Sequence, residues 1–230
     1  MASWYDIFIG AFRIAQGWFH SMAKIKRLKI IVAKIDEGTL GKPQLKVDVE
    51  PEILEWAKFI TEKVIPRYGE DHWQEDQEDK NFFGYLGQKI FESILLELKI
   101  PHLHADPLYR DSKVFRSLKM RPFDFYIPEL GTFEIKATPP GEKYTRFLAN
   151  VRRWQQEKSD YAVSIKIDRE DGGLAYLCGY LHGYEVEQLP IRDFGKGLAY
   201  WTFLNPTSGY KRLRPSSELI ELIRKHSIKL

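Results

Sequence analysis

The sequence predicts an α/β fold in which helices flank a sheet, and three observations support this prediction. Residues 121–139 contain two short runs in which apolar and polar side chains alternate, which is typical of strands. Amphipathic helical patterns come before these runs, over 82–99, and after them, over about 142–158. Two further strand patterns follow within 161–181. Helical and strand patterns that alternate in this way are typical of α/β domains.

Residues 1–36 carry a heptad pattern across nearly five repeats, and Ser21 is its only polar seam position. The pattern predicts a long helix, and the glycines and proline within 37–43 predict a linker after it. We expect this helix to form a coiled coil in a homodimer. A helix that packs on its own domain is the first alternative. A helix at a membrane surface is the second, because residues 24–29 are basic.

Composition limits the remaining possibilities. The 230 residues allow one domain with an appendage, here expected as residues 1–43 and 44–230. The net charge of +3 is too small to indicate nucleic-acid binding by itself. The single cysteine, Cys178, excludes an intrachain disulfide and a thiolate metal cluster, which favours a reducing, cytoplasmic location. A signal-peptide pattern and an apolar run of about 20 residues are both absent from the sequence.

The region before the central strands predicts two helices. The first covers 52–68, and the acidic stretch 70–80 after it predicts a loop. Asn81 is expected to cap the second helix, over 82–99, where Gln88 and Glu92 lie one turn apart at the edge of the apolar stripe. In the segment 101–106, His102, His104 and Asp106 could form a metal cluster. We predict a loop there instead, because no further nitrogen or sulfur ligand follows at a typical spacing.

The two central strands are expected to form a hairpin with polar side chains on one face. A three-residue loop that ends at Gly131 puts Asp124, Glu134 and Lys136 on the same side. Two neighbouring carboxylates suit a hard divalent cation, and an adjacent amine can orient a water molecule. The alternative is a half-exposed sheet whose outer face is simply charged.

The hairpin resembles the signature of the PD-(D/E)XK nuclease superfamily. Pro122-Phe123-Asp124 is followed ten residues later by Glu134-Ile135-Lys136, with one extra residue between the proline and the aspartate. The order of elements over about 81–182 also matches the αβββαβ core of that superfamily. The resemblance implies a restriction-endonuclease-like core, with a central mixed sheet flanked by helices, and the heptad pattern of residues 1–36 adds a helical N-terminal extension to it. It implies a divalent-metal-dependent nuclease, and we expect DNA as the substrate.

The resemblance also implies roles for individual residues. Asp124, Glu134 and the backbone carbonyl of Ile135 would hold Mg²⁺ or Mn²⁺, and Lys136 would polarise the attacking water. A helix before the hairpin commonly contributes an acid in this family. We expect Glu92 in that role, although the family acid often stands at the position of Gln88.

Basic residues near the hairpin are expected to contact nucleic acid, although a charged solvent face would have the same composition. The residues 190–230 predict a structural extension that ends in a helix over 216–229. Two other functions stay open, a nucleic-acid-binding module of this fold that has lost catalysis and a dimerisation or membrane-contact protein acting through helix 1–36. The expected nucleic-acid contacts are Arg121, Arg146, Arg152, Arg153 and Gln155.

Overall fold

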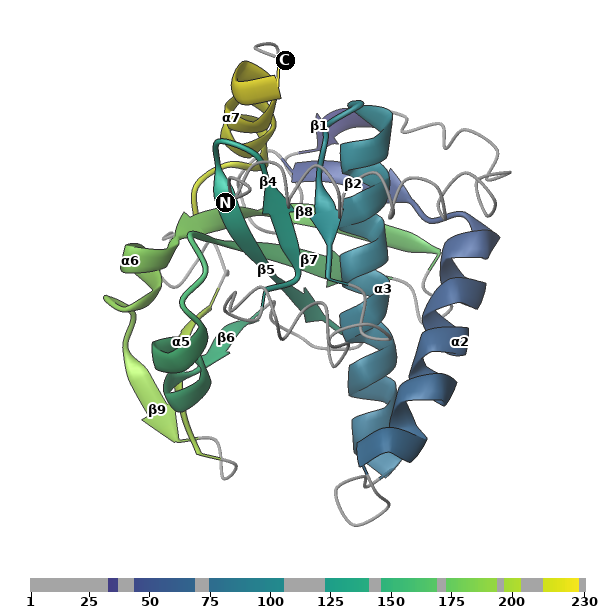
Figure 1. Ribbon diagram of the computed structural model, residues 1–230, viewed down its shortest axis with the longest axis vertical. Helices are drawn as coiled ribbons and strands as arrows, with labels where there is room; N and C mark the ends of the chain where they lie inside the picture. Colours follow the sequence, from purple (N-terminus) through teal and green to yellow (C-terminus); the bar gives the residue numbers. More distant parts are fainter. Residues whose placement is uncertain are drawn as a thin grey trace, which may run out of the picture.

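The computed structural model describes residues 33–36, 44–68, 75–105, 123–140, 146–168, 173–193, 197–203 and 213–227. Over these residues the protein has a mixed α/β fold (Figure 1). Its helices are α2 (Pro51–Tyr68), α3 (Glu75–Glu97), α5 (Val151–Glu157), α6 (Gly183–Val186) and α7 (Ser216–Ser227). Its strands are β1 (Ala33–Asp36), β2 (Gln44–Asp48), β3 (Leu103–His104), β4 (Phe125–Ile127), β5 (Gly131–Thr138), β6 (Arg146–Asn150), β7 (Tyr161–Ile167), β8 (Leu174–His182), β9 (Ile191–Asp193) and β10 (Leu198–Phe203).

The strands form two sheets within the described part of the chain. The larger sheet has seven strands in the order β1-β2-β8-β7-β5-β4-β3. Neighbouring strands within this sheet are antiparallel, except for β5 and β7, which are parallel. The parallel pair is possible because a crossover through β6 and α5 joins β5 to β7. The smaller sheet, in the order β6-β10-β9, is antiparallel throughout.

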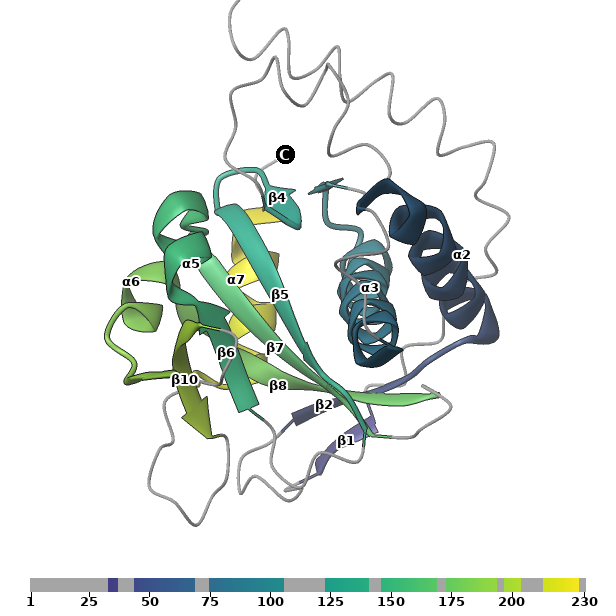
Figure 2. The same ribbon diagram turned by 90° about the horizontal axis from the view of Figure 1, so that it is seen from below.

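Helices and the smaller sheet cover the two faces of the central strands. Figures 1 and 2 both show α3 on one side of β5, with α2 outside it, and α5 on the opposite side with the smaller sheet. The apolar side chains of β5, Phe133 and Ile135, belong to the core on the α3 side, whereas β7 contributes Val163 and Ile165 to that core and Ala162 to the core on the opposite face. Figure 2 also shows the larger sheet curling around α3.

The core on the α3 side is aromatic and tightly packed. Phe91 of α3 lies edge-on to Phe125, with 5.3 Å between the ring centroids, and Phe133 completes the cluster at 5.9 Å from Phe91. All three side chains are completely buried. The core on the other face is smaller and joins β6, α5, β7, β8, α6 and β10, with Phe147, Trp154, Ala162, Leu181, Val186 and Tyr200 among its members.

A glycine lets α3 lie against β5. A Cβ atom added at Gly87 would stand 2.8 Å from the Cβ of Ala137, closer than real side chains approach. At Gly84, one turn earlier on the same helix, an added Cβ would meet no atom within 4 Å. The contact at Gly87 therefore fixes the distance between α3 and β5, and it holds the next residue, Gln88, close to the strands.

The C-terminal segment completes the larger sheet. Beyond the end of β2, Tyr180 of β8 exchanges two backbone hydrogen bonds with Arg214, at 3.1 and 2.8 Å. The helix α7 follows at once, and its Leu219 and Ile223 are fully buried in the core on the α3 side. The predicted structural extension 190–230 therefore supplies β9, β10 and α7. None of the helices in the described ranges is long and apolar enough to cross a membrane.

Several expected elements are present. The helix expected over 52–68 is α2, and the strand expected over 161–167 is β7. Its expected partner over 174–181 is β8, which extends to residue 182. The hairpin is also present, with the three-residue turn 128–130 between β4 and β5. At this turn Glu129 has a φ of 64° and Gly131 a φ of 107°, a conformation that favours glycine.

Other expectations are wrong because packing partners distant in sequence override the local pattern. The helix expected over 82–99 begins at Glu75, so residues 75–80 are helical and not a loop. Acids in the first turn favour this start, because they interact well with the helix dipole. The helix expected over about 142–158 covers only 151–157, since residues 146–150 pair with β10 as β6.

Two further corrections concern the ends of helices and loops. Residues 33–36 form β1 against β2, so the helix predicted over 1–36 does not include them. The dimer seam predicted over 1–32 and most of the linker, residues 37–43, lie outside the described residues. The loop expected around His102 and His104 contains the short strand β3, which pairs with β4.

Candidate functional site

The hairpin register brings two carboxylates to the same end of the hairpin. Phe125 pairs with Phe133 and Tyr126 with Thr132; Asp124 comes directly before β4, and Glu134 follows Phe133 on β5. The backbone N–H of Asp124 donates to the carbonyl of Phe133 at 3.0 Å, one residue away from the partner that a regular ladder would use, so the pairing is irregular at Asp124. The predicted three-residue loop is present, and it brings the segments that carry the two acids side by side.

Asp124 is almost completely buried, with 2% of its surface exposed. Its Oδ2 accepts a hydrogen bond from the backbone N–H of Ile135 at 2.7 Å, and its Oδ1 accepts one from Nε2 of Gln88 at 2.9 Å. A buried carboxylate is expensive unless such donors compensate for the lost water. The helix α3 and the strand β5 thus hold this acid at the edge where β4 begins.

Glu134 is also buried, with 7% of its surface exposed, and two basic side chains approach it. Lys136, two residues later on the same face of β5, places Nζ 2.7 Å from Oε1 of Glu134. Arg153 of α5 places Nη2 3.9 Å from the same oxygen, while about half of its side chain remains exposed. Glu134 is therefore enclosed, whereas Tyr126, Thr132 and Lys136 on the polar positions of the hairpin are half-buried, a difference that the alternation of the sequence alone does not reveal.

A pocket opens beside Glu134 and Lys136. Residues of β6 and α5 form its other walls, and among them Trp154 is 95% buried. Within the described residues, the buried indole N–H of Trp154 has no hydrogen-bond acceptor. A bound oxygen atom could accept this hydrogen bond, which otherwise costs free energy. The residues that line the pocket are Glu134, Lys136, Ala149, Asn150, Arg153, Trp154 and Ser159.

The acid expected from α3 does not reach Asp124 directly. Gln88 makes that contact, whereas Glu92 lies one turn further along α3 and is 98% buried. Glu92 forms an ion pair with Lys89 and lies 3.3 Å from Nδ1 of His104, measured from Oε1. Burial alone would raise the pKa of Glu92, but His104, His102 and Lys89 outweigh it and hold the pKa well below its ordinary value.

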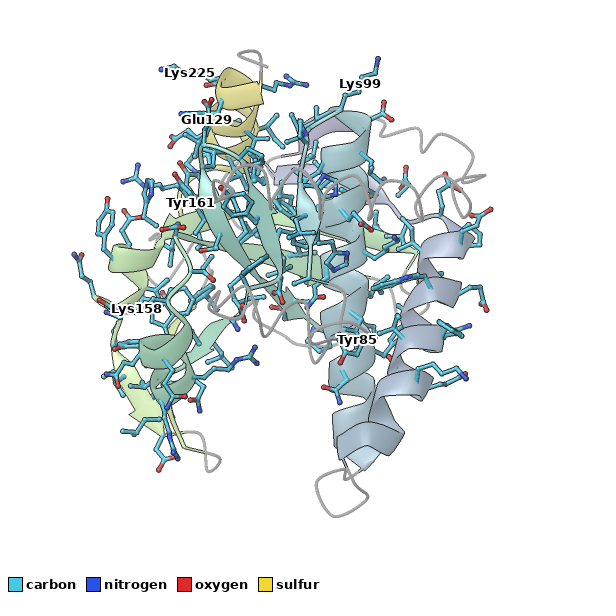
Figure 3. All side chains as sticks on the ribbon, viewed as in Figure 1. Tyr85, Lys99, Glu129, Lys158, Tyr161 and Lys225 are labelled. Carbon is cyan, nitrogen blue, oxygen red and sulfur yellow. The ribbon has the colours of Figure 1, made fainter. Side chains whose placement is uncertain are left out.

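The expected nucleic-acid contacts are only partly described. Arg152 and Gln155 are exposed on α5, next to Arg153. Arg121 lies outside the described residues, and Arg146 is described in its backbone only, as the first residue of β6. Figure 3 labels Tyr85 on α3 and Lys158 after α5, which lie on opposite sides of the site-bearing hairpin.

His104 and Trp154 were not identified as parts of this site by sequence analysis. His104 belongs to the two-residue strand β3, which is too short to produce an alternation signal in the sequence. Trp154 forms a wall of the pocket together with β6, and the position of β6 depends on its pairing with β10, which no local pattern indicates.

Comparison with protein-family models, with curated proteins and with solved structures found no match for this chain. The chemistry of the site therefore has to be inferred from its own residues.

Proposed function

We propose that this protein is a divalent-metal-dependent nuclease that hydrolyses phosphodiester bonds, with DNA as the expected substrate. The observation that carries the proposal is the buried pair Asp124 and Glu134 on adjacent strands, with Nζ of Lys136 2.7 Å from Glu134. Buried acids with an adjacent amine are costly for stability, and such costs are typical of functional sites.

The strand arrangement supports a restriction-endonuclease-like core. In the series β3-β4-β5-β7 the first two pairs are antiparallel and the last is parallel, with α3 before the series and α5 between β5 and β7. This agrees with the αβββαβ order expected from the sequence, apart from the inserted strand β6. The observation favours this fold but would also suit a binding module that lacks catalysis.

The residues present fit a small, hard cation. Magnesium and manganese prefer oxygen ligands, which the two carboxylates supply. The carbonyl of Ile135 points to the same side of β5 as its N–H, which bonds Asp124, and so can add a third oxygen. Within the described residues no group of three or more acidic, histidine or cysteine side chains has a metal-binding arrangement.

The chain's own residues would divide the work as follows. The metal, when bound, supplies Lewis acidity toward a phosphate oxygen and the attacking water. Asp124 and Glu134 would hold it, and Gln88 fixes the orientation of Asp124. Lys136 would hydrogen-bond the attacking water and offset the negative charge that develops in the transition state. Arg153, which is half exposed beside Glu134, would contact the phosphate backbone.

Cleavage of a supercoiled plasmid, with and without Mg²⁺ or Mn²⁺, tests the proposal. Lys136→Ala should reduce the cleavage rate by about a hundredfold or more, because it removes a group that acts on the reacting water. Lys166→Ala is a matched control. Lys166 of β7 stands opposite Thr138 of β5, on the face of the sheet that carries Lys136, and it pairs with Asp168. This control should cleave like the parent. Equal cleavage by both variants would make the hairpin only a charged sheet face.

The choice between an Asp124 and a Glu134 variant follows from the contacts that each buried acid makes. Asp124→Asn replaces an oxygen that accepts a hydrogen bond by an amide donor, so it also disturbs the contacts with Ile135 and Gln88. Glu134→Gln removes the same unit of charge at a position that faces Lys136 and Arg153. Loss of cleavage in Glu134→Gln with an unchanged melting temperature would support metal binding. A parent protein that binds DNA but cuts none with either metal would favour the catalytically inactive module.

A further inference from the structure

Trp154 carries a buried hydrogen-bond donor that has no partner among the described residues. Its side chain is 95% buried, in the core that α5 shares with β6, β7 and β8. The indole Nε1–H is closed to bulk water and meets no acceptor within the described part of the chain. An indole N–H can only donate, so whatever pairs with it has to supply an acceptor atom.

A second unpaired group lies on the same face of the sheet. Ser164 of β7 stands opposite Lys136 of β5, and side chains at paired positions share a face. The hydroxyl of Ser164 is completely buried and has no partner among the described residues either. Folded proteins leave few buried polar groups unpaired. Two such groups around Lys136, one beside it on the sheet and one in the wall of its pocket, indicate a place for a molecule from outside the chain.

The charges around the pocket favour an anion. Two basic side chains, Lys136 and Arg153, line it together with a single acid, Glu134. The side chain of Arg153 is 48% exposed and that of Lys136 23% exposed, whereas Glu134 is only 9% exposed. An anion that approaches from solvent therefore meets the two basic groups before it meets the acid. Phosphate is an anion whose oxygen atoms accept hydrogen bonds from side chains of this kind.

The room inside the pocket limits which part of a ligand can enter. It measures about 10 Å³, roughly the space that one water-sized group occupies. A base or a sugar ring is too large for this space. A single oxygen atom that projects from a phosphate fits it, and such an atom is also the acceptor that the N–H of Trp154 lacks.

The backbone holds Trp154 firmly in its place. At the start of α5, Oδ1 of Asn150 accepts a hydrogen bond from the backbone N–H of Arg153 at 2.9 Å. At the end of α5, the backbone N–H of Lys158 donates to the carbonyl of Trp154 at 2.9 Å. The fully buried Phe147 belongs to the same core as the indole. A donor that is fixed before the substrate binds needs no rearrangement when charge develops during the reaction, which makes its hydrogen bond effective in catalysis.

We propose that Trp154 is a catalytic residue whose indole N–H donates a hydrogen bond to a non-bridging oxygen of the reacting phosphate. The inference rests on the proposed nuclease function, because Glu134 and Lys136 line the same pocket and would act on the same phosphate. Negative charge grows on the phosphate oxygens during attack by water, and the hydrogen bond offsets part of it. The indole keeps its proton throughout, so Trp154 stabilises charge and does not act as an acid.

Removing the indole N–H tests this role. Trp154→Phe keeps an aromatic ring in the core, and its cleavage rate at saturating DNA should fall by about a hundredfold or more, as is usual when one donor of this kind is lost. Trp201→Phe is the matched control. Trp201 of β10 pairs with Leu148, lies against Arg192 and is not among the residues that line the pocket, so this variant should cleave like the parent. Equal cleavage by the two variants would overturn the proposal.

The hydrogen bond itself can be observed by NMR of the indole N–H groups in ¹⁵N-labelled protein. The signal of Trp154 is the one that disappears in Trp154→Phe. A short DNA duplex, added in EDTA so that it is not cut, should move the proton signal of Trp154 downfield, whereas chloride at the same ionic strength should not. Inorganic phosphate is the second probe. A shift with inorganic phosphate but not with DNA would reveal a site for free phosphate and overturn the proposal, as would the lack of a shift with either.

The failure of this inference and the failure of the proposed function are distinguishable. A parent protein that cuts DNA, together with a Trp154→Phe variant that cuts equally well, refutes only the role of Trp154. A parent that cuts no DNA with either metal refutes the proposed function and the catalytic role with it, and a Trp154 signal that still moves with DNA would then belong to a binding module. If Trp154→Phe does not fold, benzothienylalanine at position 154 replaces the N–H by sulfur in nearly the same shape. It should show the same loss of cleavage, and cleavage at the parent rate would overturn the proposal.

Discussion

The contact between α3 and β5 at Gly87 predicts that an alanine destabilises the protein more at Gly87 than at Gly84, which serves as the control position on the same helix. Gly87→Ala adds a methyl group 2.8 Å from the Cβ of Ala137, whereas Gly84→Ala adds one where no atom lies within 4 Å. Both substitutions gain about 1 kcal/mol of helix propensity. Only the first also overpacks a tight contact, which typically costs about 1–3 kcal/mol. The two variants should therefore differ by about 1–3 kcal/mol in free energy of unfolding.

Thermal unfolding followed by circular dichroism measures this difference. For a protein of this size about 1 kcal/mol shifts the melting temperature by roughly 2–4 °C, so Gly87→Ala should melt about 2–12 °C below Gly84→Ala. Ala137→Gly should rescue Gly87→Ala, because it removes the opposing Cβ. Equal melting temperatures, or a lack of rescue, would refute the packing argument. Since Gln88 is the next residue, Gly87→Ala should also weaken Mn²⁺ binding more than Gly84→Ala does.

Two further predictions concern α5 and the second core. Replacing Arg152 and Arg153 by glutamine should weaken DNA binding for all sequences and reduce the slope of log affinity against log salt by about one unit per lost phosphate contact. Lys58→Gln on α2 is the control and should leave that slope unchanged, because Lys58 pairs with Glu55 at the surface. An unchanged slope in the double arginine variant would show that α5 faces solvent and not DNA. Burial raises the pKa of the Cys178 thiol to about 12, so it should stay protonated and unreactive toward a disulfide reagent at pH 8.5 until the protein is unfolded. Rapid labelling of the folded protein would show that the second core opens.

The elements that were predicted well are those with a strong local signal. The strand β7 and the hairpin turn follow from alternation and from Gly131, and α2 follows from its apolar stripe. The pairing of Phe125 with Phe133, which brings Asp124 and Glu134 to one end of the hairpin, follows in the same way, because the length of a hairpin loop fixes the register. Local patterns were sufficient for this part of the site.

The parts that were missed depend on partners distant in sequence. The strand β6 was expected to be helical because its apolar spacing suits both structures, and only its pairing with β10 decides between them. The burial of Glu134 depends on α5 and the smaller sheet, which no local pattern brings to the hairpin. The choice between Gln88 and Glu92 depends on how closely α3 approaches β5, which is set by the pair Gly87 and Ala137.

The pairing of β6 with β10 also bears on synthesis and folding. The strand β6 lies in the middle of the chain, but its partner spans residues 198–203 and the bridge to β8 involves Arg214. A nascent chain that ends near residue 190 already contains Asp124, Glu134 and Lys136. It still lacks the strand that holds Ala149 and Asn150 against the pocket. Because domains are synthesised from the N-terminus, the site acquires its last wall only after residues 198–203 have left the ribosome.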